Sequence, residues 1–125
     1  MIEWTIILVT MAGLSSSAMD KLQFHYYTSI FRFLPSQFWN PEVSWKNKYI
    51  NQDSTLGRRK ILGLLNVPVF LTDGWHLLKA IHLNSICLAI AINIEQVSIL
   101  WAFIVIRLIL GLTFIFGYRI LWQEE

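Results

Sequence analysis

ILWAFIVIRLILGLTFIFGYRILW, at residues 99–122, is the most continuous apolar segment of the sequence. Arg107 is its one charged residue before Arg119, which lies close to the end of the segment. About 20 predominantly apolar residues suffice to cross the hydrocarbon core of a bilayer as an α-helix. The segment, extended to residues 97–122, therefore predicts a transmembrane helix.

A second apolar segment, residues 67–94, directly precedes the first. The link between them, Asn93-Ile94-Glu95-Gln96, leaves room only for a tight reversal of the chain. We therefore expect the two segments to form an antiparallel transmembrane hairpin.

The composition also indicates a membrane protein. Hydrophobic residues make up 55% of the 125 residues and charged residues 14%, whereas an average soluble domain has about 25% charged residues. A soluble domain of this size has too little interior to cover so much apolar surface, so we expect a single membrane domain over residues 1–125. The single cysteine, Cys87, excludes an intrachain disulfide.

Residues 4–22 form a further apolar segment. The small residues after Ser15 resemble a signal-peptide cleavage region, but the segment is preceded by Glu3 and by no Lys or Arg. Because a signal peptide begins with positive charge, we favour a first membrane helix that is retained over a signal that is cleaved. This helix is expected to continue to about Phe31 and to end by Pro35 at the latest.

The section from residue 23 to residue 66 is polar and aromatic together, and it is expected to lie at the cytoplasmic face of the membrane. Asn40 and Pro41 suit the N-cap and the first position of a short helix. Residues 51–54, Asn-Gln-Asp-Ser, are typical of a turn.

The end of this section is apolar again. Residues 61–65 are expected to lie in the membrane interface or to dip into the bilayer. The following helix is predicted to begin near Asn66, with Pro68 in its first turn.

The distribution of cations predicts the orientation of the chain. Between the first and second apolar segments lie Lys21, Arg32, Lys46, Lys48, Arg58, Arg59 and Lys60. The hairpin link carries Glu95 and no cation. Because cytoplasmic loops are enriched in Lys and Arg, we expect three spans in the inner (plasma) membrane, with the N-terminus outside and the C-terminus in the cytoplasm.

Arg107 falls near the middle of the last predicted span. A charge at that depth costs at least about 2.5 kcal/mol, so it needs a partner or water. The helical stripe that holds Arg107 and Gly111 is expected to face the stripe that holds Asn84 and Cys87, since small residues let helices approach closely. Arg107 then belongs to an anion site, a substrate path or a pore, or it snorkels or bonds to a neighbouring subunit.

Asp73 and His76 lie one helical turn apart in the sequence LTDGWHLLK. Such a pair can act as a catalytic base with its orienting group, and Lys79, Lys46 and Lys48 would then hold a phosphate. Two ligands do not make a metal site, so no metal is predicted. The structural alternative is a hydrogen bond between helices, from Tyr118 or Arg119 to Asp73.

Aromatic and basic residues alternate in FWNPEVSWKNKY, which holds Trp39, Trp45, Lys46 and Lys48. Aromatic rings suit the interfacial zone of a bilayer, and cations suit anionic head groups. We expect either head-group contact or a cytoplasmic cap in which the Trp residues pack and the cations only fix the topology. Single-stranded nucleic acid is recognised by similar residue types, but it is not the expected partner of a section held at the membrane.

The motifs FWNP (residues 38–41), SWKNKY (44–49) and LTDGWH (71–76) resemble a group of small, uncharacterised bacterial integral membrane proteins. The likeness covers the middle of the chain. It implies that the interfacial section and the start of the second helix form one unit, and it brings no activity, cofactor or catalytic residue.

The sequence thus predicts an all-α membrane protein of three transmembrane helices with an aromatic, basic cytoplasmic loop. It leaves three functions open: a homo-oligomeric module that binds an anionic lipid or a small anion at the cytoplasmic interface, a lipid-acting enzyme that uses Asp73 and His76, and an oligomeric pore with Arg107 facing the lumen. The candidate binding residues of the first function are Arg107, Asn84, Lys79, Trp45, Lys46, Lys48 and Trp39. No phosphate loop, nucleophile elbow or zinc-binding helix motif is present, so the sequence identifies no cofactor.

Overall fold

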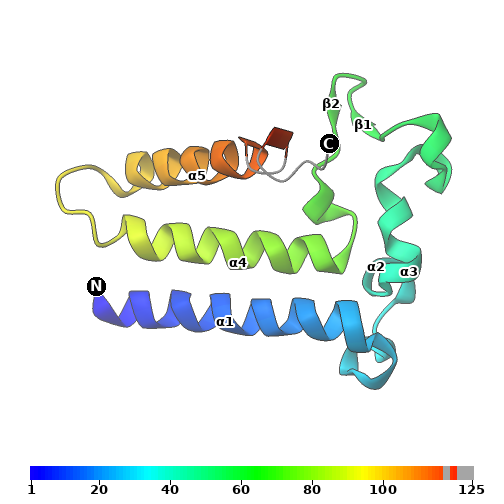
Figure 1. Ribbon diagram of the computed structural model, residues 1–125, viewed down its shortest axis with the longest axis horizontal. Coiled ribbons are helices and arrows are strands. Elements are labelled where there is room, and N and C mark those ends of the chain that lie inside the picture. Colours follow the sequence, from blue (N-terminus) through cyan, green and yellow to red (C-terminus); the bar gives the residue numbers. More distant parts are fainter. Residues whose placement is uncertain (117–118, 121–125) are drawn as a thin grey trace. The chain divides into compact units, whose positions relative to one another are not determined.

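The computed structural model describes residues 1–116 and 119–120. Over these residues the chain is mostly helical. Its two-stranded sheet follows the short 3-10 turns in the middle of the sequence and precedes the helix Gly74–Ala91 (Figure 1). The chain falls into two compact units. The first unit contains residues 1–10 and the chain from residue 83 onward, and the second contains residues 11–82.

Helix α1, Ile2–His25, covers the first predicted span and extends beyond it. The regular helix ends earlier than expected, because the chain continues as the 3-10 turns Tyr26–Thr28 and Ile30–Phe33. Ser29, between these turns, has an extended backbone, and its hydroxyl donates to the Tyr26 carbonyl at 2.7 Å. This local bond replaces the helical pattern and stops the helix before Phe31.

Helix α5, Ile99–Phe116, lies within the last predicted span, of which residues 117–118 and 121–122 fall outside the described part of the chain. Its 18 residues extend about 27 Å, close to the hydrocarbon thickness of a bilayer. Its apolar side chains are mostly uncovered by protein, for example Leu100 at 68% and Leu112 at 66% relative exposure. A helix that is apolar all round and uncovered is suited to lipid.

Within the described residues, two helical segments have the length and apolar composition of membrane spans, Ile2–Thr28 and Ile99–Phe116. Helix α4, Gly74–Ala91, falls in the predicted second span but is not one of them. Polar residues on α4 lower its hydropathy.

The predicted start of α4 is wrong. Asn66 belongs to a β-strand, and Pro68 precedes the 3-10 turn Val69–Leu71. The helix starts only at Gly74, since the Asp73 carboxylate accepts a hydrogen bond from the His76 backbone N–H at 2.9 Å and so acts as the N-cap.

Small side chains fill the interior of the first unit. The most buried residues are Ser85, Cys87, Ala89, Ala91 and Ala102. The Asn93 amide donates to the Thr5 hydroxyl at 2.9 Å, which joins the segment after α4 to the beginning of α1. Gly111 is not part of this packing, because a Cβ at that position would meet no atom within 4 Å. Among the described residues, Gly111 therefore makes no close helix contact.

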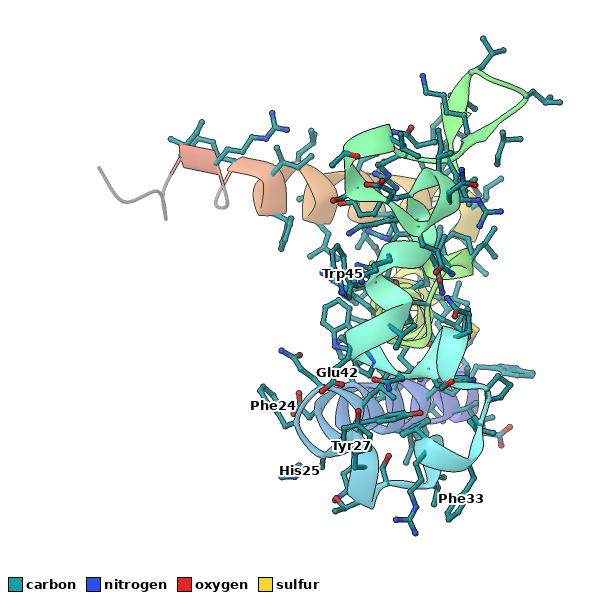
Figure 2. The ribbon with its side chains drawn as sticks, turned by 90° about the vertical axis from the view of Figure 1, so that its right-hand side faces the viewer. Phe24, His25, Tyr27, Phe33, Glu42 and Trp45 are labelled. Carbon is teal, nitrogen blue, oxygen red and sulfur yellow. The ribbon has the colours of Figure 1, made fainter. Side chains whose placement is uncertain are left out.

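The second unit begins with the remainder of α1 and continues through the short helices α2, Ser36–Trp39, and α3, Pro41–Ser44. The predicted cap of α3 is confirmed: the Asn40 side chain accepts from the Glu42 backbone N–H at 3.1 Å, and Pro41 is the first helical residue. The Tyr27 hydroxyl donates to the Glu42 carboxylate at 2.8 Å, and Phe24 and Phe33 point outward at this end of the unit (Figure 2).

Three 3-10 turns follow, at Trp45–Lys48, Ile50–Gln52 and Ser54–Leu56. The predicted turn at residues 51–54 is confirmed, and Asn51 and Gln52 have positive φ angles there. The backbone N–H and the hydroxyl of Thr55 donate to Asp53 at 2.9 and 2.7 Å, and these bonds lower the pKa of the Asp53 carboxyl.

The chain then forms a short antiparallel hairpin of β1, Lys60–Ile61, and β2, Leu65–Asn66. The sequence marked this apolar stretch as interfacial without indicating strands. The 3-10 turn Val69–Leu71 then leads to Thr72, Asp73 and the start of α4.

Candidate functional site

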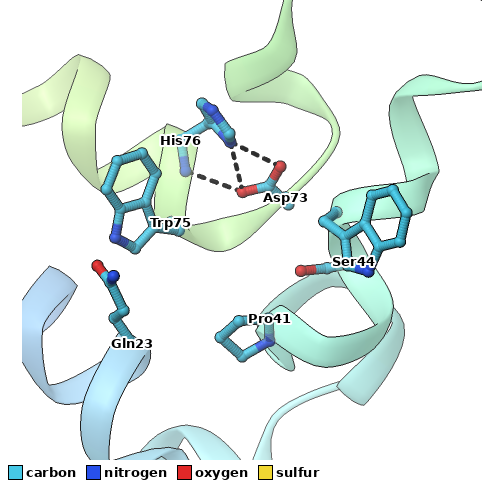
Figure 3. A pocket seen from close by; sticks show the side chains of 7 residues that line it. Gln23, Pro41, Ser44, Asp73, Trp75 and His76 are labelled. Atoms are coloured by element: carbon cyan, nitrogen blue, oxygen red, sulfur yellow. Dashed lines mark hydrogen bonds and ion pairs between the residues drawn. The ribbon is translucent and has the colours of Figure 1, made fainter. Parts of the chain in front are cut away.

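The second unit contains a pocket of about 250 Å³ beside the start of α4 (Figure 3). Its walls come from α1, from α3 and the residue that follows it, and from the beginning of α4. The lining residues are Gln23, Pro41, Ser44, Trp45, Asp73, Trp75 and His76. The pocket therefore unites the interfacial section with the residues that begin α4.

Asp73 and His76 form a hydrogen-bonded pair on this pocket. The Nδ1 atom of His76 lies 3.0 and 2.8 Å from the two carboxylate oxygens of Asp73. Asp73 is 3% exposed, while the His76 side chain is 35% exposed. Because Asp73 also caps α4, the helix itself sets the geometry of the pair.

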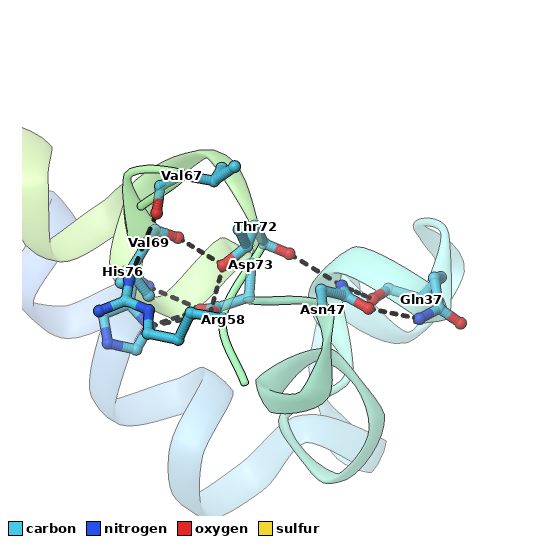
Figure 4. Close-up of polar contacts among 8 residues, drawn as sticks. All are labelled: Gln37, Asn47, Arg58, Val67, Val69, Thr72, Asp73 and His76. Atoms are coloured by element: carbon cyan, nitrogen blue, oxygen red, sulfur yellow. Dashed lines mark hydrogen bonds and ion pairs between the residues drawn. The ribbon is translucent and has the colours of Figure 1, made fainter. Parts of the chain in front are cut away.

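A polar network behind Asp73 holds the segment that carries it (Figure 4). The Asn47 amide donates to the backbone carbonyl groups of Gln37 and Thr72, at 2.6 and 2.8 Å. The Thr72 hydroxyl donates to the Val69 carbonyl at 2.7 Å. Asn47 thereby fixes the residue before Asp73 to the α2 region, a role that the sequence did not reveal.

Two indole rings form walls of the pocket, and each has a lysine ammonium over it. The Lys46 nitrogen lies 5.5 Å from the Trp45 ring centroid, and the Lys79 nitrogen lies 5.2 Å from that of Trp75. These distances are within the range of cation–π attraction. Of the predicted candidates, Trp45 thus lines the pocket together with the Asp73–His76 pair, whereas Lys46 and Lys79 contact the indole rings without being lining residues.

The indole N–H of Trp75 is a buried donor with no hydrogen-bond acceptor among the described residues. Figure 3 shows the Trp75 ring on the same side of the pocket as Gln23, with Ser44 across from them. Buried polar groups are nearly always hydrogen-bonded, to protein or to water, so a water or a bound molecule in the pocket can supply the acceptor for the Trp75 N–H. Gln23, Ser44 and Trp75 were not predicted as site residues, because only the folded chain brings them together.

Trp39 and Lys48 lie apart from the lining of the pocket. The Trp39 ring stacks on Phe31 at 5.3 Å and packs against Gly74, where any Cβ would overlap it. Trp39 therefore has a packing role, as the alternative interpretation of the aromatic section held. Lys48 lies over the Tyr49 ring at 5.3 Å.

Arg107 and Asn84 belong to the first unit and form a pair of their own. The Arg107 Nε donates to the Asn84 side-chain oxygen at 2.8 Å, the contact that the two helical stripes predict. His82, also on α4 but in the second unit, is turned elsewhere: its Nδ1 lies 2.8 Å from the Ala12 carbonyl oxygen of the same unit.

Two other expectations concern Asp73 and metal binding. The hydrogen bonds shown for Asp73 go to Thr72 and His76, and Tyr118 lies outside the described residues. Over residues 1–116 and 119–120, no group of three His, Cys, Asp or Glu side chains is arranged to hold a metal ion.

The pocket can thus accept a molecule with an apolar part between the indoles and a polar part near Trp75, His76 and the lysines. The paired carboxylate of Asp73 is directed at His76.

No family model, curated protein or solved structure matches the chain.

Proposed function

We propose that the chain is a three-span protein of the inner (plasma) membrane, with its interfacial section in the cytoplasm. The two apolar helices α1 and α5 and the cations between α1 and α4 support this topology. The polar side chains of α4 are compatible with an inner position, because His82 bonds to the Ala12 carbonyl and Asn84 to Arg107. Polar residues within membranes usually face the protein interior in this way.

The function that the geometry supports best is binding of an anionic lipid in the pocket beside α4. The observation that carries it is the pair of indole walls, Trp45 and Trp75, each with a lysine over its ring, and the N–H of Trp75, which has no acceptor among the described residues. The apolar walls would hold acyl chain or glycerol backbone, and Lys46 and Lys79 would attract the phosphate. An ester or phosphate oxygen would accept from Trp75.

The first test measures the affinity of the detergent-solubilised protein for phosphatidylglycerol by native mass spectrometry. Each lysine near an anionic head group contributes about 1 kcal/mol. The double variant Lys46→Gln, Lys79→Gln should therefore bind about 30-fold more weakly, since 1.4 kcal/mol is a factor of ten. Trp45→Ala, which removes one wall, should also weaken binding.

The control is Lys21→Gln, which removes an equal charge from α1 away from the pocket lining and should leave the affinity near that of the unaltered chain. Equal binding by the double variant and the unaltered chain would contradict the proposal. Competition with excess inorganic phosphate distinguishes a lipid site from a site for a small free anion. At a lipid site the phosphatidylglycerol stays bound, whereas at a site for a small anion the phosphate displaces it.

A second candidate function, a lipid-acting enzyme, is favoured by the Asp73–His76 pair. With Nδ1 held by Asp73, the Nε2 of His76 is the ring atom left to exchange a proton with a substrate. Ser44 lines the same pocket, and Lys46 and Lys79 would hold the phosphate. Lys48, over Tyr49, has no part in this arrangement.

His76→Asn separates the two functions. If the pair is structural, the variant should retain bound lipid and lose about 0.6 kcal/mol of stability, the average for a hydrogen bond inside a membrane protein. If the pair is catalytic, incubation of the unaltered chain with phospholipid should yield a cleaved product by mass spectrometry, and the variant should yield none. We expect the structural outcome, and lipid turnover that His76→Asn abolishes would overturn it.

A further inference from the structure

The β1–β2 hairpin presents an apolar tip that the rest of the described chain does not cover. Ile61 pairs with Leu65, and the Leu64 N–H donates to the Ile61 carbonyl at 3.1 Å to close the turn. At the tip, Leu62 is 91%, Leu64 80% and Leu65 71% exposed. In water this arrangement is unfavourable, because each leucine loses the free energy that burial would supply.

The backbone makes the leucine at the tip more unusual still. Leu62 has a φ of 51° and Gly63 a φ of 70°. Two successive positive φ angles are the requirement of a type I′ turn, for which Asn, Asp and Gly are strongly preferred. The left-handed backbone of Leu62 and the exposure of its apolar side chain to water both cost free energy. Contact of this side chain with an apolar surrounding would offset that cost.

Cations lie at the base of the same hairpin. Arg58, Arg59 and Lys60 line an open hollow of about 660 Å³, together with Ile50, Leu56 and Gly57. Arg58 and Arg59 are aimed by bonds to the carbonyl groups of Val67 and Asn47, both at 3.3 Å. The Arg58 Nε is buried and has no partner among the described residues.

The order along the hairpin, cations first and leucines beyond them, matches the order of a leaflet, phosphates first and hydrocarbon beyond. Leu62 lies two residue steps beyond Lys60, a distance of about 7 Å at the rise of a strand. Interfacial elements bury their apolar side about 5–10 Å into the boundary between head groups and acyl chains. A hydrophobic groove on another protein would not require the cations.

We propose that the β1–β2 hairpin inserts its leucine tip into the anionic leaflet of the membrane, with lipid phosphates in the hollow lined by Arg58, Arg59 and Lys60. This rests on the proposed membrane location and not on the lipid pocket beside α4. The hairpin would anchor the interfacial section to the bilayer at a second point.

The experiment places an environment-sensitive NBD label on the tip, as Leu64→Cys in a Cys87→Ala background, in liposomes with and without phosphatidylglycerol. The matched control carries the label at Ser54→Cys, on an exposed turn of the same unit. The tip label should emit at shorter wavelength in anionic liposomes and be quenched by nitroxide lipids, whereas the control label should be quenched by aqueous iodide. Equal iodide quenching of both labels would overturn the proposal. So would a tip label that neither iodide nor nitroxide lipid quenches, because such a label would be covered by protein.

Further variants test the two parts of the hairpin. Leu62→Asn suits the left-handed turn position and so keeps the hairpin, but it should reduce nitroxide quenching of the tip label severalfold. Lys60→Gln, which removes one of the three cations of the hollow, should reduce the dependence on phosphatidylglycerol, while Lys21→Gln should not. Unchanged quenching in Leu62→Asn would contradict the proposal.

Failure of this proposal is distinguishable from failure of the pocket function. An uninserted tip on a protein that still retains lipid in native mass spectrometry overturns the hairpin anchor alone. An inserted tip on a protein without pocket lipid supports the anchor and overturns the pocket function.

Discussion

At the scale of single residues, Gly74 has the most specific requirement. It is the first residue of α4, directly after the Asp73 cap, and the Trp39 ring occupies the space that a side chain would need. Trp39 in turn stacks on Phe31. A single glycine therefore joins the start of α4 to the aromatic residues of the interfacial section.

We expect Gly74→Ala to lower the free energy of unfolding by about 1–3 kcal/mol, the usual effect of forcing extra atoms into a packed site. Thermal unfolding in detergent, followed by circular dichroism, measures the change. Gly13→Ala is the matched control, since Gly13 lies within α1 and a Cβ there meets no atom within 4 Å. That substitution should instead stabilise the helix by about 0.5–1 kcal/mol. Shifts of the same sign in both variants would contradict the packing of Trp39 on Gly74.

Residue chemistry was predictable from the sequence where partners lie close along the chain. The Asn40–Pro41 cap is a local pattern, and the pairing of Asp73 with His76 follows from their spacing in a helix. The bond from Asn47 to Thr72 joins residues 25 positions apart, so no local pattern indicates it. The same holds for Gln23, which reaches the pocket only through the packing of α1.

At the scale of elements, the apolar segments predicted the positions of the long helices. They did not predict the start of α4 or the β1–β2 hairpin. Pro68 is favoured at the start of a helix, yet Asp73 caps α4 five residues later because its side chain reaches the His76 N–H. The apolar residues 61–65 are too few for their periodicity to separate a strand from a helix. Only the pairing of Lys60 with Asn66 makes them a hairpin.

These elements also explain why the pocket lies where it does. A helix start provides the capping carboxylate of Asp73, and a run of short helices and turns brings Trp45 to the same pocket. The sequence placed Trp45, Lys46 and Lys79 among the candidate residues by type alone. It also named Trp39 and Lys48, which the folded chain uses for packing on Gly74 and Tyr49.

At the scale of the whole molecule, Arg107 sets the main requirement. It lies about 12 Å along α5 from the first residue of the helix, near its midpoint. Its one hydrogen bond among the described residues uses Nε, to Asn84, although a guanidinium carries five N–H donors. The remaining donors need acceptors, and the uncovered apolar surface of α5 offers none.

We therefore expect the chain to form a homo-oligomer in lipid, in which another copy supplies acceptors to Arg107. Native mass spectrometry of protein released from lipid nanodiscs measures the subunit number. Arg107→Leu keeps most of the apolar volume and should weaken the assembly while the monomer stays folded. Asn84→Ala, the matched variant, removes only the acceptor within the chain, so it should preserve the subunit number and lower stability by about 0.6 kcal/mol, the average for such a bond.

The outcomes for Arg107→Leu also separate the roles of the charge. If the oligomer is unchanged and equally or more stable, Arg107 is a tolerated charge whose removal relieves a desolvation penalty, and the predicted role in assembly is wrong. If the oligomer persists but anion conductance across liposomes is lost, the residue lines a pore. A monomeric unaltered chain in lipid would contradict the assembly itself, because the guanidinium would then draw its remaining acceptors from water and head groups by snorkelling.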